Sequence, residues 1–356
     1  MLPKYLKTLL SFRTGVFFPG KAISTFAIPS QLDVSLRSGV LFPAEAISRL
    51  VRKPPRRASL SRVFLPILLI FSAGITACTP AAGVAPQSSS AKVLVVAAEN
   101  FYGDIAQQLG GEYVSVTSIL SDPNIDPHEY ESNVQNGVAV SKANLVIENG
   151  DNYDTWMDKL LSASPNPQRM VLVGADIADH KLPDNPHVWY GIDNIQTIAR
   201  AITGALEKID PADKPAFDQN LSKFLASLAP IQQKLSELKA SYAGTPVGLT
   251  ETIFLYQTDP IGLKVLTPFD FEKAIAEGND PPADTVLTTT DQISQHQIKV
   301  LIYNVQTVTP VTTNLQNEAK QANIPIVPVS ETMPPGKTYQ QWMLDQLAVL
   351  QKALGG

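Results

Sequence analysis

The sequence has very little cysteine and little histidine. Among its 356 residues there is one cysteine, Cys78, and there are four histidines. A single cysteine excludes an intrachain disulfide and a metal site made of several thiolates. The sequence also lacks the GxxxxGK[ST] loop of nucleotide-binding proteins and the HExxH motif of zinc hydrolases. A metal site in this chain would therefore depend on imidazole and carboxylate groups.

One apolar run near the amino end is typical of a secretory signal. Residues 63–77 (VFLPILLIFSAGITA) follow the basic stretch 52–62 and come directly before Cys78. The run is too short and too soon interrupted for a membrane-spanning helix. Its end, ITAC, looks like a bacterial lipobox. We expect residues 51–78 to be a lipoprotein signal peptide with Cys78 as its lipidated cysteine, and residues 79–90 to be a flexible tether. The alternative is that Cys78 is a buried free cysteine.

The first 50 residues do not fit this arrangement. They contain an internal repeat, in which RTGVFFPGKAIS at 13–24 resembles RSGVLFPAEAIS at 37–48. Two copies are too few for a solenoid. We interpret residues 1–50 as a mis-assigned start, with translation beginning near Val51, or as an extra cytoplasmic or targeting segment.

The predicted mature chain has a deficit of basic residues. Residues 1–77 hold 11 of the 28 Lys and Arg but 2 of the 33 Asp and Glu, which leaves 17 basic and 31 acidic residues and a net charge of −14. Binding to nucleic acid needs a basic face. The charge therefore argues against a nucleic-acid partner and is compatible with a protein that attracts cations.

Eight apolar, β-branched runs recur along the mature chain, and helical patterns separate most of them. This alternation predicts an α/β fold with parallel sheets, and the length is enough for two lobes. The predicted strands are 93–97, 114–119, 144–148, 170–173, 247–250, 264–266, 299–303 and 324–329. We place an amino-terminal lobe at 91–209 and a carboxyl-terminal lobe at 244–356.

A long amphipathic pattern lies between these two lobes. Apolar residues recur every three or four positions over 210–243, which predicts one long helix with a kink at Pro230. At about 1.5 Å per residue, such a helix would reach roughly 40 Å. It could be an ordinary core helix or a spine that links the lobes.

Two histidines stand in matching settings. His128 lies in DPHEY and His187 in NPHVW, so each follows a proline in a loop near a strand-like run. Imidazole is the commonest metal-binding side chain, and the pair predicts a metal site more strongly than either residue alone. The other two, His180 and His296, lie in polar segments and are expected to be solvated. The alternative is that His128 and His187 are loop residues that bond to the backbone.

Two glutamates also stand in matching settings. Glu251 follows the predicted strand at 247–250, and Glu331 follows the one at 324–329. Ligands of parallel α/β folds bind beyond the carboxyl ends of the strands, and a buried carboxylate needs a partner. Both glutamates are therefore candidates for one cleft, although both could be exposed loop acids.

These motifs resemble the metal-binding solute-binding lipoproteins of bacterial zinc and manganese ABC importers, over about residues 91–354. The matching segments are DPHEYE, PHVW, Glu251 with Tyr256, and Glu331 with Tyr339; the family more often has Asp at the place of Glu331. The resemblance implies two α/β lobes that are joined by one long helix and hold a single metal ion between them.

The predicted function is that of a monomeric extracytoplasmic receptor anchored to the membrane through acylated Cys78. His128, His187, Glu251 and Glu331 would bind one divalent metal ion, which an ABC permease and its cytoplasmic ATPase would import. Two carboxylates favour Mn²⁺, and Zn²⁺ is a close second because most sites bind it more tightly. The chain lacks the His-rich loop that some zinc members of the family carry. We expect no enzymatic activity; the alternatives are a secreted zinc-dependent hydrolase and a surface adhesin.

Overall fold

The computed structural model describes residues 91–355 of the chain. The predictions for the signal peptide, for Cys78 and for the repeat lie outside the described residues. Within the described part, no helix combines the length and the apolar character that a bilayer crossing needs.

The amino-terminal lobe is built on a parallel sheet in the order β2-β1-β3-β4. Its strands are β1 (Val93–Glu99), β2 (Val114–Leu120), β3 (Leu145–Glu148) and β4 (Met170–Val173). The two central strands, β1 and β3, are almost entirely buried, as expected for parallel strands that helices cover on both faces. All four strands lie where the β-branched runs predicted them.

Helices cover both faces of this first sheet. Alternate residues of β1 point to opposite faces, so that Val95 belongs to one hydrophobic core and Val96 to another. The helices α1 (Asn100–Gly110) and α5 (Ile192–Ile209) contribute to the first core, and α2 (Val134–Lys142) and α3 (Thr155–Ala163) contribute to the second. A single turn of helix, α4 (Gly174–Ile177), follows β4.

The carboxyl-terminal lobe repeats this plan with the sheet order β6-β5-β7-β8, again parallel. Its strands are β5 (Pro246–Leu249), β6 (Lys264–Val265), β7 (Leu301–Asn304) and β8 (Ile326–Val329). Its helices are α8 (Leu255–Ile261), α9 (Phe269–Ala276), α10 (Ala283–Ser294), α11 (Pro310–Gln321) and α12 (Tyr339–Leu354). The prediction of two α/β lobes with parallel sheets is therefore confirmed.

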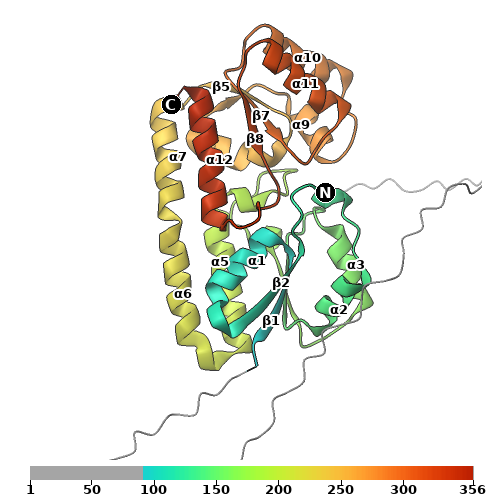
Figure 1. Cartoon of the computed structure of the whole chain (residues 1–356), viewed down its shortest axis with the longest axis vertical. Helices are drawn as coiled ribbons and strands as arrows, with labels where there is room; N and C mark the ends of the chain where they lie inside the picture. Colours follow the sequence, from blue (N-terminus) through green and yellow to red (C-terminus); the bar gives the residue numbers. More distant parts are fainter. Residues whose placement is uncertain (1–90, 356) are drawn as a thin grey trace, which may run out of the picture. The chain divides into compact units, whose positions relative to one another are not determined.

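The predicted long helix is present as two consecutive helices. α6 (Lys214–Ser227) packs against α1 and α5, and α7 (Ala229–Tyr242) packs against α8 and α12 (Figure 1). The break falls at Leu228, because Pro230 has no N–H to donate and fits only in the first turn of α7. The two helices bury one apolar face, with Phe217, Phe224, Leu228, Ile231, Leu235 and Leu238 in the core.

The strand order brings the predicted site residues to the facing edges of the two sheets. His128 lies in the loop that follows β2, whereas Glu251 and Glu331 each come two residues after the end of a strand, β5 and β8. β7 lies between β5 and β8 in the sheet and ends at Asn304. The loops that follow β2, β5, β7 and β8 therefore surround one site.

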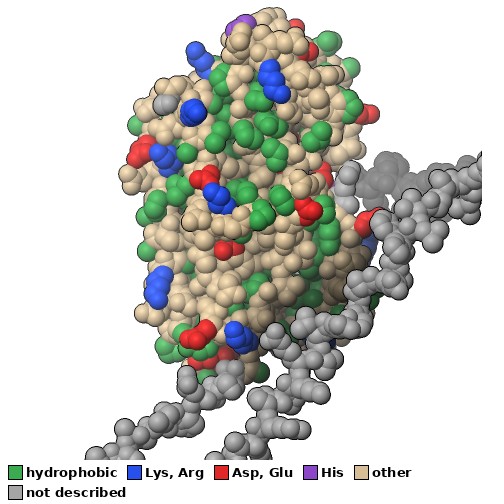
Figure 2. Space-filling view, viewed as in Figure 1, with side chains coloured by type: hydrophobic (Ala, Val, Ile, Leu, Met, Phe, Trp, Pro, Cys, Tyr) green, Lys and Arg blue, Asp and Glu red, His purple; other side chains and the backbone are tan. Residues whose placement is uncertain are grey.

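The surface drawn in Figure 2 mixes charges of both signs. Basic and acidic side chains are interspersed on this face among polar and hydrophobic ones, and the described residues make no continuous basic area there.

Candidate metal site

His128 is positioned by a short turn. The side chain of Asp126 accepts a hydrogen bond from the backbone N–H of His128 (2.9 Å), and Pro127 begins a 3-10 turn over Pro127–Glu129. Trp156 of α3 donates its Nε1–H to the carbonyl of Pro127 (3.3 Å). The His128 ring packs edge-on against the ring of Tyr153, with 4.8 Å between the centroids. The loop thus presents the ring from a fixed backbone.

His187 is held more deeply. Its side chain is fully buried, and Oδ1 of Asn185 accepts hydrogen bonds from both the backbone N–H (3.1 Å) and the ring Nδ1 (2.8 Å) of His187. The amide of Asn185 is oriented by its Nδ2, which donates to the carbonyl of Thr252 (2.8 Å). Because the amide oxygen is an acceptor, Nδ1 must carry the proton, and Nε2 is left with a free lone pair.

Glu331 lies between the two histidines. Its Oε1 accepts a hydrogen bond from Nδ2 of Asn304 (2.5 Å), while its Oε2 lies 3.9 Å from Nε2 of His128 and 3.9 Å from Nε2 of His187. Ligand atoms about 2 Å from one ion can be up to about 4 Å apart. The two distances of 3.9 Å meet this limit, and one ligand atom from each of the three residues lies within 4.8 Å of the other two.

Glu251 is close to this group but not part of it. It is 1% exposed, and neither of its carboxylate oxygens has a hydrogen-bond partner. Burial is the main cause that raises the pKa of the Glu251 carboxyl, and repulsion from the Glu331 carboxylate raises this pKa further. The structure therefore brings His128, His187 and Glu331 together and leaves Glu251 as a buried neighbour with free oxygens.

The electrostatics of the site favour neutral side chains when no cation is present. Burial is the main cause that raises the pKa of the Glu331 carboxyl, as it is for Glu251. Burial, followed by the charge on His128, lowers the pKa of the His187 imidazole well below its usual value. A bound divalent cation would compensate the charge of two buried carboxylates and needs neutral imidazoles, so these shifts suit a metal ion.

The free atoms of the site are all possible electron-pair donors. Nε2 of His128, Nε2 of His187, Oε2 of Glu331 and both oxygens of Glu251 are buried without a hydrogen-bond partner. Buried polar atoms without a partner are uncommon in folded proteins, and here five of them belong to the four predicted residues. A cation satisfies such a set, whereas a hydrogen-bond acceptor would not.

The other predicted residues have clear positions as well. His180 and His296 are exposed, as the sequence predicted. The Tyr256 hydroxyl accepts from the backbone N–H of Leu182 (2.9 Å) and donates to the carbonyl of Asn185 (3.2 Å). The Tyr339 hydroxyl donates to the carbonyl of Trp189 (2.7 Å). Both tyrosines come from the carboxyl-terminal lobe and hold the segment around His187.

Sequence analysis missed the residues that orient these candidate ligands. Asn185 could have been noticed because it begins the NPHVW motif, but nothing near Asn304 or Tyr153 in the sequence signals its role. Asn304 bonds to a glutamate 27 positions away. Tyr153 packs edge-on against both histidine rings, with centroid distances of 4.8 and 5.8 Å.

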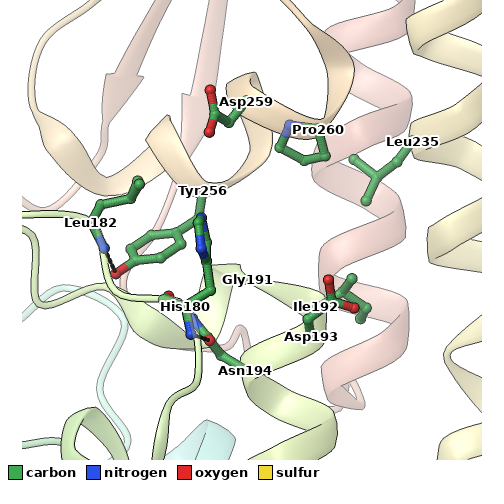
Figure 3. Close-up of a pocket in the computed structure, with 10 residues that line it drawn as sticks. All are labelled: His180, Leu182, Gly191, Ile192, Asp193, Asn194, Leu235, Tyr256, Asp259 and Pro260. Atoms are coloured by element: carbon green, nitrogen blue, oxygen red, sulfur yellow. Dashed lines mark hydrogen bonds between the residues drawn. The ribbon is translucent and has the colours of Figure 1, made fainter.

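A cavity of about 250 Å³ lies apart from this group (Figure 3). It is lined by residues from the start of α5, from α7 and from α8, and none of the four predicted ligands contributes to its wall. The figure shows the Tyr256 ring directed at the backbone of Leu182, the contact described above. The cavity thus borders the segment that leads to His187 without reaching the ligand atoms.

The family model and the curated relatives that match this chain agree with one another. A family model described as "Zinc-uptake complex component A periplasmic" matches residues 95–353. The metal ABC transporter substrate-binding lipoprotein ScbA of Streptococcus cristatus is 28% identical over 184 residues, which are 48% of this chain and 59% of that protein. The manganese ABC transporter substrate-binding lipoprotein PsaA of Streptococcus pneumoniae is 28% identical over 193 residues, 50% of this chain and 59% of PsaA. The chain thus matches about three-fifths of the length of these relatives.

Solved structures share the fold at lower sequence identity. The periplasmic zinc binding protein TroA from Treponema pallidum is 18% identical, with a TM-score of 0.64 over 74% of this chain and 100% of that chain. FpvC from Pseudomonas aeruginosa, in complex with Mn²⁺, is 18% identical, with a TM-score of 0.62 over 74% of this chain and 98% of that chain. These similarities agree with the two-lobe α/β fold.

Proposed function

The chain belongs to the family of the periplasmic component A of zinc-uptake complexes, and on that premise we propose that it is an extracytoplasmic receptor that binds one divalent metal ion for import. The family is a binding component of a transporter and not an enzyme family. The observation that carries the proposal is the buried group of His128, His187 and Glu331, whose free ligand atoms lie within 4.8 Å of one another.

Glu251 is proposed as the fourth ligand. It is buried beside Glu331, and both of its oxygens are free. Two neutral imidazoles and two carboxylates would neutralise a divalent cation, so that no net charge stays buried in the closed site. A movement of the loop after β5 toward the other three ligands would complete the coordination.

The metal ion is proposed to be Mn²⁺ or Zn²⁺. Carboxylate oxygens suit Mn²⁺, and imidazole suits Zn²⁺. Relatives named for manganese and a structural neighbour named for zinc support both ions. The equal number of oxygen and nitrogen ligands favours Mn²⁺, whereas the general order of affinities favours Zn²⁺.

The proposed partners follow from the family. An ABC permease in the membrane would receive the metal ion, and a cytoplasmic ATPase would drive its import. We also propose that Cys78 carries a lipid that anchors the receptor, acting as a monomer, to the outer face of the membrane. The lipobox-like sequence and the relatives named as lipoproteins support the anchor.

The experiment that tests this proposal compares the four histidines. Elemental analysis of the purified protein after incubation with Mn²⁺ or Zn²⁺ and removal of the excess should give one ion per chain. His128→Ala and His187→Ala should lose the ion, while His180→Ala and His296→Ala should keep it. A ligand that binds only the folded state raises the melting temperature, so the metal-induced rise should follow the same division. Equal losses in all four variants would contradict the proposal.

A further inference from the structure

One buried glutamine bridges the two loops that carry His128 and Glu331. Gln306 lies two residues after the end of β7 and is 7% exposed. Its side chain reaches the loop after β2 in one lobe and the loop after β8 in the other. It has no free ligand atom of its own, so the metal site described above does not include it.

The amide oxygen of Gln306 fixes the backbone beside one ligand. Oε1 accepts hydrogen bonds from the backbone N–H of Glu331 (2.6 Å) and from the backbone N–H of Thr332 (3.1 Å). Asn304, two residues earlier, holds the carboxylate of Glu331 through Oε1. The end of β7 therefore determines both where the backbone of Glu331 lies and which of its oxygens is free.

The amide nitrogen of Gln306 holds the loop of another ligand. Nε2 donates to the carbonyl of Ile125 (2.7 Å), three residues before His128, and to Oγ1 of Thr332 (3.1 Å). A glutamine amide has two N–H donors and an oxygen with two lone pairs. All of this capacity is used, so neither loop can move away without leaving a buried polar group without a partner.

His128 is the ligand through which such a bridge would matter most. Its side chain is 22% exposed, whereas those of His187 and Glu331 are fully buried. His128 is therefore the one residue of these three whose side chain reaches solvent, although its Nε2 is buried. A displacement of the loop after β2 would uncover this Nε2 and remove one ligand at the same time.

We propose that Gln306 is a positioning residue that latches the His128 loop to the Glu331 loop and thereby sets how long the metal ion stays bound. This inference rests on the proposed function, because it assumes that the two residues are ligands. Opening the latch breaks the contact to Ile125 and loosens the backbone of Glu331 together. The ion is therefore released when the loop after β2 in one lobe separates from the loop after β8 in the other.

The test replaces Gln306 with methionine, which has nearly the same length but makes none of these hydrogen bonds. The matched control is Gln292→Met. Gln292 is also buried (6% exposed), but its Nε2 donates to the carbonyl of Leu266 within the carboxyl-terminal lobe. Zn²⁺ or Mn²⁺ is loaded, and its dissociation is followed after mixing with excess EDTA. Amide hydrogen exchange of residues 124–130 and 330–333 is measured in the metal-free proteins.

We expect Gln306→Met to bind the ion about 10–100-fold more weakly, the usual effect of losing a residue that orients ligands. Most of this loss should come from faster dissociation, and both peptide segments should exchange faster than in the parent. Gln292→Met should leave all three quantities unchanged. Gln306→Asn is the second variant, because its side chain is one methylene too short to reach both loops; it should change them in the same direction.

A parent-like dissociation rate in Gln306→Met and Gln306→Asn would overturn the latch. The proposal would also be overturned if Gln292→Met increased the rate of metal dissociation as much as Gln306→Met, because the effect would then come from a general loss of stability. Failure of the proposed function has a different signature. In that case the parent itself binds no metal, or His187→Ala binds it as tightly as the parent does.

Discussion

Oδ1 of Asn185 lies 2.8 Å from Nδ1 of His187, and this contact decides which ring nitrogen faces Glu331. The Asn185 amide is held in this orientation by its second bond, from Nδ2 to the carbonyl of Thr252, the residue after Glu251. One side chain thus fixes the tautomer of a histidine in one lobe and contacts the segment of a glutamate in the other. Groups that orient a metal-bound histidine in this way tune its affinity.

Asn185→Ala should therefore weaken metal binding without removing a ligand. The His187 ring would lose its orientation and its preferred tautomer, and we expect the dissociation constant to rise about 10–100-fold. Asn220→Ala is the control, because Asn220 also makes a single side-chain bond to a backbone carbonyl, that of Leu109, away from the site. Competition titration with a metal indicator measures both. Equal affinities of the Asn185 variant and the parent would show that the contact does not matter.

Glu251→His tests the fourth ligand through selectivity. Replacing a carboxylate with an imidazole removes a hard, negatively charged ligand and leaves three nitrogens and one carboxylate, a set closer to a tetrahedral zinc site. The variant should therefore lose more affinity for Mn²⁺ than for Zn²⁺. If Glu251 only orients a ligand, both affinities should fall by the same factor. An unchanged ratio of the two dissociation constants would exclude Glu251 as a ligand.

Glu148 predicts a pH dependence of stability that is separate from metal binding. Burial, with repulsion from Asp154 next, raises its pKa to about 8. In the unfolded chain the carboxyl ionises near its usual pKa of about 4.5. Between these values the folded state holds a proton that the unfolded state releases, so the stability contributed by neutral Glu148 is complete below about pH 4.5 and is lost as the pH rises through 8.

Glu148→Gln should abolish this loss. Its melting temperature should be close to that of the parent at pH 4 and higher than that of the parent at pH 9, because glutamine stays neutral throughout. Glu112→Gln, at an exposed position in the same lobe, controls for the removal of one negative charge. Thermal unfolding in metal-free buffers gives the comparison. A difference from the parent that is the same at both pH values would contradict the buried, protonated state.

Cys78→Ala tests the membrane anchor. Without the thiol no lipid can be attached, so the protein should leave the membrane fraction or accumulate as an unprocessed precursor. Cell fractionation followed by mass measurement of the amino terminus distinguishes these results from the parent. A variant that stays in the membrane with the same processed mass would show that the ITAC sequence is not a lipobox.

Much of the fold could be predicted because local patterns determine it. Every predicted strand has a counterpart in the structure, since runs such as Val93–Ala97 combine β-branched residues with burial on both faces. The pattern over 210–243 was continuous in its apolar period, but a period does not show where a helix stops. The break at Leu228 depends on the missing N–H of Pro230, and it is confined to this one residue, whose backbone angles stay in the helical region.

The four candidate ligands could be singled out because each has a local signal in the sequence. His128 and His187 follow prolines in similar motifs, and Glu251 and Glu331 follow strands, so each is marked by its neighbours. The contacts that orient them join distant parts of the chain. Gln306 meets Ile125 across 181 positions, which no local pattern encodes. The position of Glu251 outside the group of three was equally unpredictable, because no local pattern sets how far its carboxylate lies from the other three side chains.

The most direct test of the account is a crystal structure of the Mn²⁺-loaded protein with anomalous diffraction data collected near the manganese absorption edge. We predict one strong anomalous peak per chain, bonded to Nε2 of His128, Nε2 of His187 and carboxylate oxygens of Glu251 and Glu331 at about 2.0–2.3 Å, the range usual for such ligands. A peak at any other place, or no peak between these four side chains at saturating Mn²⁺, would contradict the account.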